Sequence, residues 1–198
     1  MKKKIIAVLL ASFMLFGATA CGKKNEEGNT NVGISGQESV SGNSGASESL
    51  SVGAEVEQFI NVDLPSISGS RDKAISLYNK YFEESGSIDS EEWLRSLEYD
   101  ALASFDTYLE KLGAFEYTTP EVQSLKNSYL QSAQLQRDAI QDVVNGIKND
   151  DAALFSSAEQ KIAESETYYK SYTDSLQSIC ANNNIKINGS IGTSTDAE

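Results

Sequence analysis

The clearest pattern of apolar and polar positions lies towards the end of the chain. Apolar or small residues recur there at alternating intervals of three and four, at Phe155, Ala158, Ile162, Ser165, Tyr169, Tyr172, Leu176 and Ile179. This spacing places them on one stripe of an α-helix and is typical of the a and d positions of a helical seam. The pattern therefore predicts one long amphipathic helix, whose seam has a single polar position at Ser165.

A second long helix is predicted just before it. Thr119, Pro120 and Glu121 supply an N-cap residue, a proline at the first helical position and an acid in the first turn. The seam then repeats at three and four residues and is interrupted by Gln136; its apolar members are Val122, Tyr129, Ala133, Ile140, Val143 and Ile147. The polar turn at 149–151 ends this helix and caps the next, and a connection this short makes the two helices antiparallel neighbours.

Two more helices are predicted upstream, over about 71–85 and 90–112. In the second of these, the pattern assigns Leu94, Ala101, Phe105, Tyr108 and Leu112 to the seam, with Trp93 and Leu97 beside it. From 55 to 67 we expect a short helical turn followed by an extended segment, because Asn61, Asp63 and Pro65 disfavour a continuing helix. The fold class predicted is all-α, an antiparallel three- to four-helix bundle.

The first 54 residues have a different character. A start with three lysines, an apolar run from Ile5 to Ala18 and small residues before residue 21 form a secretory signal peptide, predicted to span residues 1–20. Residues 22–53 are rich in glycine and serine, a composition that favours a flexible tether over a packed core. We therefore expect a tether over 21–54, a bundle domain over 55–185 and a flexible tail over 186–198.

The sequence Ala18-Thr19-Ala20-Cys21 resembles the lipobox of bacterial lipoproteins. In that family the cysteine thiol receives a diacylglycerol group and the chain is cut before it. The resemblance implies that Cys21 is lipidated, and that the chain is a lipoprotein anchored on the extracytoplasmic face of the cell membrane. Ala18 departs from the commonest residue of the motif, which is leucine. The later part of the chain also looks like the helical-hairpin ectodomains of uncharacterised bacterial lipoproteins, a likeness that brings no chemistry with it.

Composition narrows the function classes. The chain carries 29 acidic and 16 basic residues, a formal net charge of −13, which argues against nucleic acid as a partner. It contains no histidine, and this excludes Ser-His-Asp and Cys-His nucleophilic systems and histidine-ligated metal sites. Its second cysteine, Cys180, would have no partner for an intramolecular disulfide once Cys21 is acylated. We expect no metal, no catalytic residue and no cofactor besides the acyl lipid on Cys21.

The candidate ligand-binding residues are Tyr129, Gln136, Ser165 and Tyr169, all on the seams of the two long helices. When the helices pair around their turn, Gln136 and Ser165 fall in the same layer, where they can hydrogen-bond to each other. Such a buried polar pair either fixes the register of the helices or lines a small pocket. The tyrosines are either core residues with their hydroxyls at the edge or a surface on which a ligand stacks.

These observations favour a lipid-anchored protein that binds or scaffolds at the bacterial cell surface without catalysis. Its partners are the membrane, through the anchor, and an envelope protein or a wall component. The alternative is a small-ligand receptor or sensor with a pocket between helices, and a minor alternative is a carboxylate-dependent hydrolase.

Overall fold

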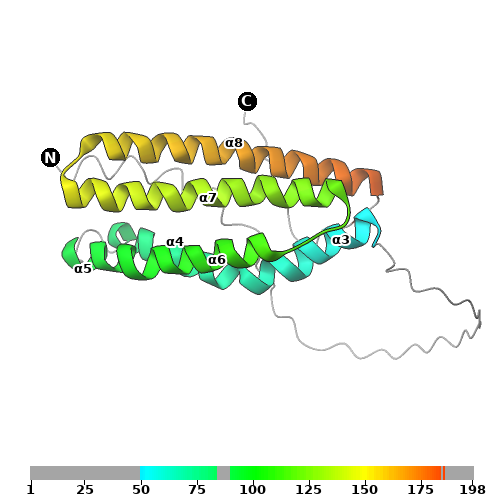
Figure 1. The fold of residues 1–198 in the computed structure, drawn as a ribbon, viewed down its shortest axis with the longest axis horizontal. Coiled ribbons are helices and arrows are strands. Elements are labelled where there is room, and N and C mark those ends of the chain that lie inside the picture. The colour runs from blue at the N-terminus through cyan, green and yellow to red at the C-terminus, as the bar shows by residue number, and fades with distance from the viewer. Residues whose placement is uncertain (1–49, 84–89, 184, 186–198) are drawn as a thin grey trace, which may run out of the picture.

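The computed structural model describes residues 50–83, 90–183 and 185. The predicted signal peptide, the lipidation site Cys21, nearly all of the tether and the tail at 186–198 lie outside this part. The described residues form an all-α bundle of four helical rods with roughly parallel axes (Figure 1). The fold class is therefore the predicted one, with four helices rather than three.

The first rod runs from Val52 to Glu83 and is longer than expected. It consists of α3 (Val52–Gln58), the π-helical turn η2 (Phe59–Asp63) and α4 (Leu64–Glu83). It begins three residues before the predicted domain start at 55, because the Ser51 hydroxyl accepts a hydrogen bond from the amide of Ala54 at 3.3 Å.

The expectation of an extended segment after residue 60 is wrong. Pro65 does not end the helix, although a proline in a helix interior lacks an N–H and clashes with a preceding carbonyl. Here it is the second residue of α4, just after η2, and the amide of Leu64 donates to the carbonyl of Phe59, five residues back. The backbone ladder shifts by one residue at this turn, and this shift lets the chain continue through the proline.

The second rod joins α5 (Ser90–Arg95), the π-helical turn η3 (Ser96–Ala101) and α6 (Leu102–Ala114). Its predicted seam is wrong at the start. Trp93 and Leu97 are buried and Leu94 is only half-buried, because the extra residue in η3 rotates the preceding turn against the regular 3.6-residue period. From Ala101 onwards the predicted seam is confirmed.

The two long helices, α7 (Pro120–Asn149) and α8 (Ala152–Asn183), pair over most of their length as the pattern predicted. Asp150 ends α7 in the left-handed conformation, with φ of 54°. The carboxylate of Asp151 then accepts a hydrogen bond from the amide of Ala153 at 2.9 Å. The predicted turn at 149–151, which closes one helix and caps the next, is confirmed.

The beginning and the end of the described chain lie at the same end of the bundle. A methyl group built on Gly53 would lie 3.6 Å from the side chain of Ile185, beyond the end of α8. Figure 1 shows α3 at one end of the bundle, with α5 and the α7–α8 turn at the other. We call these the α3 end and the α5 end.

Candidate functional site

Two of the four candidate residues lie in an aromatic cluster at the contact between α7 and α8. The ring centroids of Tyr129 and Tyr169 are 6.3 Å apart, and those of Tyr129 and Tyr172 are 4.8 Å apart. Phe59 of the first rod adds an edge-on contact to Tyr129 at 6.4 Å. The two seams bring Tyr129 and Tyr169 together, and their rings pack against neighbouring rings in the geometry of a core cluster.

Gln136 and Ser165 are both buried, with exposed fractions of 2% and 0%, but they do not form the expected hydrogen bond to each other. The amide oxygen of Gln136 accepts a hydrogen bond from the guanidinium of Arg71 on α4, at 3.1 Å. The long glutamine side chain therefore reaches out of the hairpin to the first rod, because a cation there stabilises its buried oxygen.

Ser165 satisfies its hydroxyl within its own helix, by donating to the carbonyl of Ile162 at 2.7 Å. The bond between the two helices comes instead from Ser132, whose hydroxyl donates to the carbonyl of Ser165 at 2.9 Å. Small residues at these two positions let the backbones of α7 and α8 approach closely. The contact is structural in character and leaves the Ser165 hydroxyl already engaged.

Arg71 is the residue of this region that the sequence did not single out. It lies three and seven residues before Ala74 and Tyr78, both buried on the same rod, so it occupies a seam position at helical spacing. An arginine at a seam position is the feature of the sequence that could have identified it, since a buried or half-buried arginine needs polar partners in the core.

Burial governs the electrostatics of the cluster. Burial and a hydrogen bond with Tyr129 raise the pKa of Tyr108 well above its ordinary value, although the positive charge of Arg71 opposes the rise. Burial likewise raises the pKa of Tyr172. These phenols stay neutral at physiological pH, so the cluster supplies packing and hydrogen bonds rather than an acid or base.

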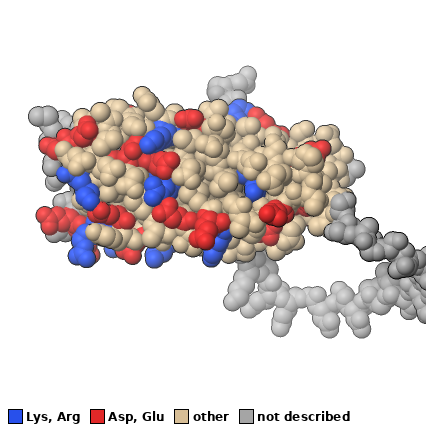
Figure 2. All heavy atoms as spheres, in the orientation of Figure 1, with Lys and Arg blue, Asp and Glu red and all other residues tan. Residues whose placement is uncertain are grey.

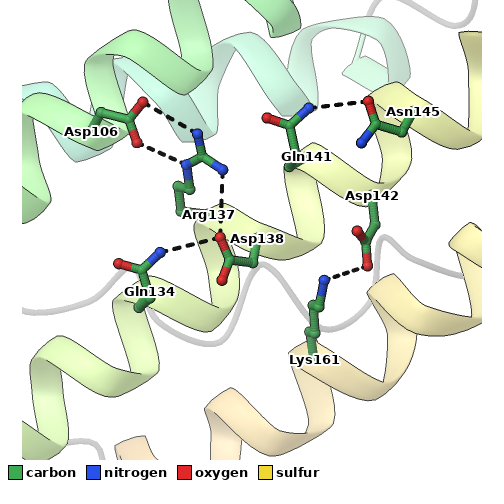
Figure 3. A network of polar contacts seen from close by, with 8 residues as sticks. All are labelled: Asp106, Gln134, Arg137, Asp138, Gln141, Asp142, Asn145 and Lys161. Atoms are coloured by element: carbon green, nitrogen blue, oxygen red, sulfur yellow. Dashed lines mark hydrogen bonds and ion pairs between the residues drawn. The ribbon is translucent and has the colours of Figure 1, made fainter.

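A network of polar contacts runs along α7 on the outside of this core (Figure 3). Arg137 holds both carboxylate oxygens of Asp106 on α6, at 2.8 and 3.3 Å. Asp142, which is mostly buried, accepts from Lys161 and Ser157 of α8, each at 2.6 Å. These side chains tie α7 to a neighbour on each side, and their carboxylates are used in holding the helices together.

Glu55 is the most strongly held carboxylate among the described residues and was not a candidate from the sequence. It is 3% exposed, and it accepts hydrogen bonds from the amides and the hydroxyls of both Thr118 and Thr119, at 2.5 to 2.9 Å. Burial would raise its pKa, but the four donors outweigh burial and lower the pKa to about 2. Glu55 fastens α3 to the start of α7, which is a structural task.

Two open hollows lie on the outer surface, away from the four candidate residues. One, of about 330 Å³, lies where α4 faces η3 and α6, and it is lined by Gly69, Ser70, Lys73, Tyr99, Asp100, Ala103, Ser104 and Thr107. The other, of about 620 Å³, lies beside α5 and η3 and is lined by Glu91, Glu92, Arg95, Ser96, Tyr99 and Asp100. Tyr99 and Asp100 belong to both.

Two kinds of feature are absent from the described residues. Within 50–83, 90–183 and 185, no group of three or more acidic or cysteine side chains is placed to hold a metal ion. Nor does that part of the chain contain a helix with the length and apolar character needed to cross a membrane.

Comparisons with protein-family models, with curated proteins and with solved structures found no match to this chain.

Proposed function

We propose that this chain is a lipid-anchored protein of the bacterial cell surface that acts by binding or scaffolding rather than by catalysis. The observation that carries the proposal is the order of features at the start of the sequence. A basic start and an apolar run lead to Ala18-Thr19-Ala20 and then Cys21, which resembles a lipoprotein signal. An acyl group on Cys21 gives the chain a membrane attachment that needs no spanning helix.

The distance between Cys21 and the bundle supports a raised position above the membrane. The first helix begins at Val52, so about 30 residues separate it from the anchor. A Gly/Ser-rich chain of this length has a mean reach of about 30 Å and a limit of roughly 100 Å. The tether joins the bundle at the α3 end, so the α5 end is the one further from the attachment point along the bundle.

The character of the bundle supports binding over catalysis. The carboxylates that are buried or paired, such as Glu55, Asp106 and Asp142, are engaged by donors from neighbouring segments. On the face drawn in Figure 2, side chains of both charges are interspersed and lie mostly on the half towards the α5 end. A mixed surface of this kind, on an acidic chain, favours specific contacts over general attraction to anionic polymers.

The anchor is tested by fractionating cells that express Cys21→Ala. Loss of the acylated cysteine is expected to release the protein into the medium or to leave it unprocessed, and metabolic labelling with a palmitate analogue is expected to disappear. Cys180→Ala is the matched control and should keep both the label and the membrane fraction. Membrane retention and label that are unchanged in Cys21→Ala would refute lipidation.

The binding role is tested by crosslinking on intact cells, with capture of the anchored protein and analysis of what comes with it. A reproducible envelope protein or wall fragment, absent when Cys21→Ala displaces the bundle, is the expected result. Recovery of the bundle alone at all crosslinker lengths would count against a surface partner.

A further inference from the structure

The hollow between α4 and α6 carries a feature that the tyrosine cluster lacks, which is a large aromatic side chain open to solvent. Tyr99 is 66% exposed, whereas Tyr129, Tyr169 and Tyr172 pack against one another. It stands on η3, two residues from the buried Leu97 and Ala101 on either side, so the helix directs it away from the core. Its ring borders the 330 Å³ hollow and the larger one beside it.

The side chains around the smaller hollow, which is a shallow and open depression, bring several polar groups together. Ser70 and Ser104 bring hydroxyls, and Lys73 and Asp100 bring one positive and one negative charge. The hydroxyl of Thr107, also in the lining, already donates to the carbonyl of Ala103 at 2.9 Å. The space beside the Cα atom of Gly69 is open, since a methyl group built there would meet no heavy atom within 4 Å. The hollow is therefore close to neutral in sum, rich in both donors and acceptors, and flanked by one flat apolar ring.

This combination selects a ligand class. A sugar ring has an apolar face that stacks on an aromatic side chain and a rim of hydroxyls that both donate and accept hydrogen bonds, which matches Tyr99 with the hydroxyls and charges around it. The volume lies at the lower end of the range for ligand pockets and suits one or two sugar units. Since Tyr99 and Asp100 also border the second hollow, an extended glycan can continue past the ring along η3.

The other polymer classes fit less well. The chain's net charge of −13 repels nucleic acid and anionic lipid. A peptide bound as an added strand needs a free sheet edge, and a bound helix needs an apolar groove; the described residues around Tyr99 are helical and mostly polar. η3 directly follows α5 on the second rod, so Tyr99 lies towards the end of the bundle opposite α3, where the described chain begins (Figure 1).

We propose that Tyr99 and the hollow between α4 and α6 form a carbohydrate-binding site for a neutral glycan of the cell envelope or its surroundings. The inference rests on the proposed function, since it names the chemical class of the partner that an anchored binder at the surface would hold.

The test is isothermal titration calorimetry of the full mature chain in a detergent without sugar groups. The probes are chitohexaose, cellohexaose and maltohexaose. At least one is expected to bind, and Tyr99→Ala is expected to weaken that binding by about tenfold, which is about 1.4 kcal/mol. Tyr99→Phe keeps the ring and should bind within about twofold of the wild type. Gly69→Leu, which fills the hollow, is expected to abolish binding.

Matched controls separate the site from general damage. Tyr168→Ala removes an exposed tyrosine of α8, and Gly113→Leu adds a side chain at another helical glycine whose surroundings are open; both should bind as the wild type does. Absence of binding by all three probes overturns the inference, as does equal binding by Tyr99→Ala. Binding of tetralysine in place of the sugars would assign the site to cationic peptides and would also overturn it.

Because this calorimetric measurement uses purified protein, it can fail while the crosslinking and fractionation results still support an anchored binder.

Discussion

The carboxylate of Glu55 binds Thr119, which lies 64 residues further along the chain. It accepts a hydrogen bond from the Thr119 amide at 2.9 Å and another from the Thr119 hydroxyl at 2.6 Å. Thr119 is the N-cap residue of α7, but its hydroxyl makes no bond to its own helix. The first turn of α7 is thus stabilised by an anion that α3 supplies. The relationship joins the first described helix to the start of the long hairpin.

Replacement of this carboxylate should change stability in a pH-dependent way. The pKa of Glu55 is lowered from 4.5 to about 2 in the folded chain, so its contribution is fully present above the unfolded pKa. That contribution is lost as the pH falls from about 4.5 towards 2. We expect Glu55→Gln to lower the free energy of unfolding by about 2 to 3 kcal/mol at pH 7, and by progressively less at lower pH. Urea unfolding at several pH values measures this.

Glu57→Gln is the control for that experiment, because Glu57 is exposed on the same helix. It should change the free energy of unfolding by less than about 0.5 kcal/mol at any pH. A constant loss in Glu55→Gln from pH 7 down to pH 2.5 would contradict the role assigned to the charge.

The glycines of the bundle should respond to alanine in opposite directions. A methyl group on Gly146 would lie 3.2 Å from the carbonyl oxygen of Asp151 and 3.2 Å from the ring of Phe155, whereas one on Gly69 would meet no heavy atom within 4 Å. We expect Gly69→Ala to stabilise the chain by about 0.5 to 1 kcal/mol. Gly146→Ala should destabilise it by about 1 kcal/mol or more, because the gain in helix propensity is outweighed by overpacking. Thermal unfolding of both variants checks the sign, and stabilisation by Gly146→Ala would show that the turn can move aside.

Two ion pairs on α8 should differ in strength. Lys161 pairs with the mostly buried Asp142 at 2.6 Å, whereas Lys170 and Asp174 are both exposed. Lys161→Met is expected to cost about 1 to 3 kcal/mol, since it removes a charged partner from a buried carboxylate. Lys170→Met is expected to cost less than about 0.5 kcal/mol. The midpoints of urea unfolding compare them, and raised salt should narrow the difference little, because the Asp142 pair is partly shielded from ions. Equal losses would mean that burial of Asp142 adds nothing.

Arg71 and Gln136 should show energetic coupling. Arg71→Met removes the cation from the buried oxygen of Gln136, and we expect a loss of about 1 to 3 kcal/mol. Gln136→Leu alone leaves the guanidinium in the core without this acceptor. The double variant, with apolar groups at both positions, should be more stable than the sum of the two losses predicts. A double-mutant cycle of unfolding free energies measures the coupling, and strictly additive losses would show that the 3.1 Å contact carries no energy.

The hairpin was predictable because its information is local. The three-and-four spacing of α8, the Thr119-Pro120 start of α7 and the polar turn at 149–151 each act within a few residues. The same short turn sets which layers of the two helices face each other, and Tyr129 and Tyr169, each assigned to a seam, lie with ring centroids 6.3 Å apart.

The two π-helical turns account for most of what the sequence did not reveal. A periodic pattern assumes 3.6 residues per turn throughout, so it placed Leu94 in the core in place of Trp93 and Leu97. The expected end of the first helix came from Asn61, Asp63 and Pro65, which the π-helical turn η2 carries the helix past. No residue type marks where an extra residue is inserted into a helix. Its signature, a run of apolar positions four apart at Trp93, Leu97, Ala101 and Phe105, becomes clear only once the buried set is known.

The partner of Gln136 lies on α4, and the pattern of the α7–α8 hairpin does not predict where α4 packs against it. The register of the hairpin suggested Ser165 as the partner of Gln136, but a glutamine side chain is long enough to reach α4, where Arg71 offers a charged donor. The site around Tyr99 was likewise hidden, because it needs the relative position of α4, η3 and α6, whose contacts come from segments well separated in sequence.

The common location of Leu50 and Ile185 at the α3 end determines how the bundle would carry a mechanical load. If a glycan is held near Tyr99 while the chain is pulled from Ser51, the force runs along the helix axes. The contacts of the first rod with its neighbours, including those of Glu55 with Thr118 and Thr119, then resist together in shear. A pull between Ser51 and Ile185 would instead load the contacts of α3 with α8 one after another, so that they break in sequence. The force needed to unfold the bundle is therefore expected to be higher for a pull between Tyr99 and Ser51 than for a pull between Ser51 and Ile185.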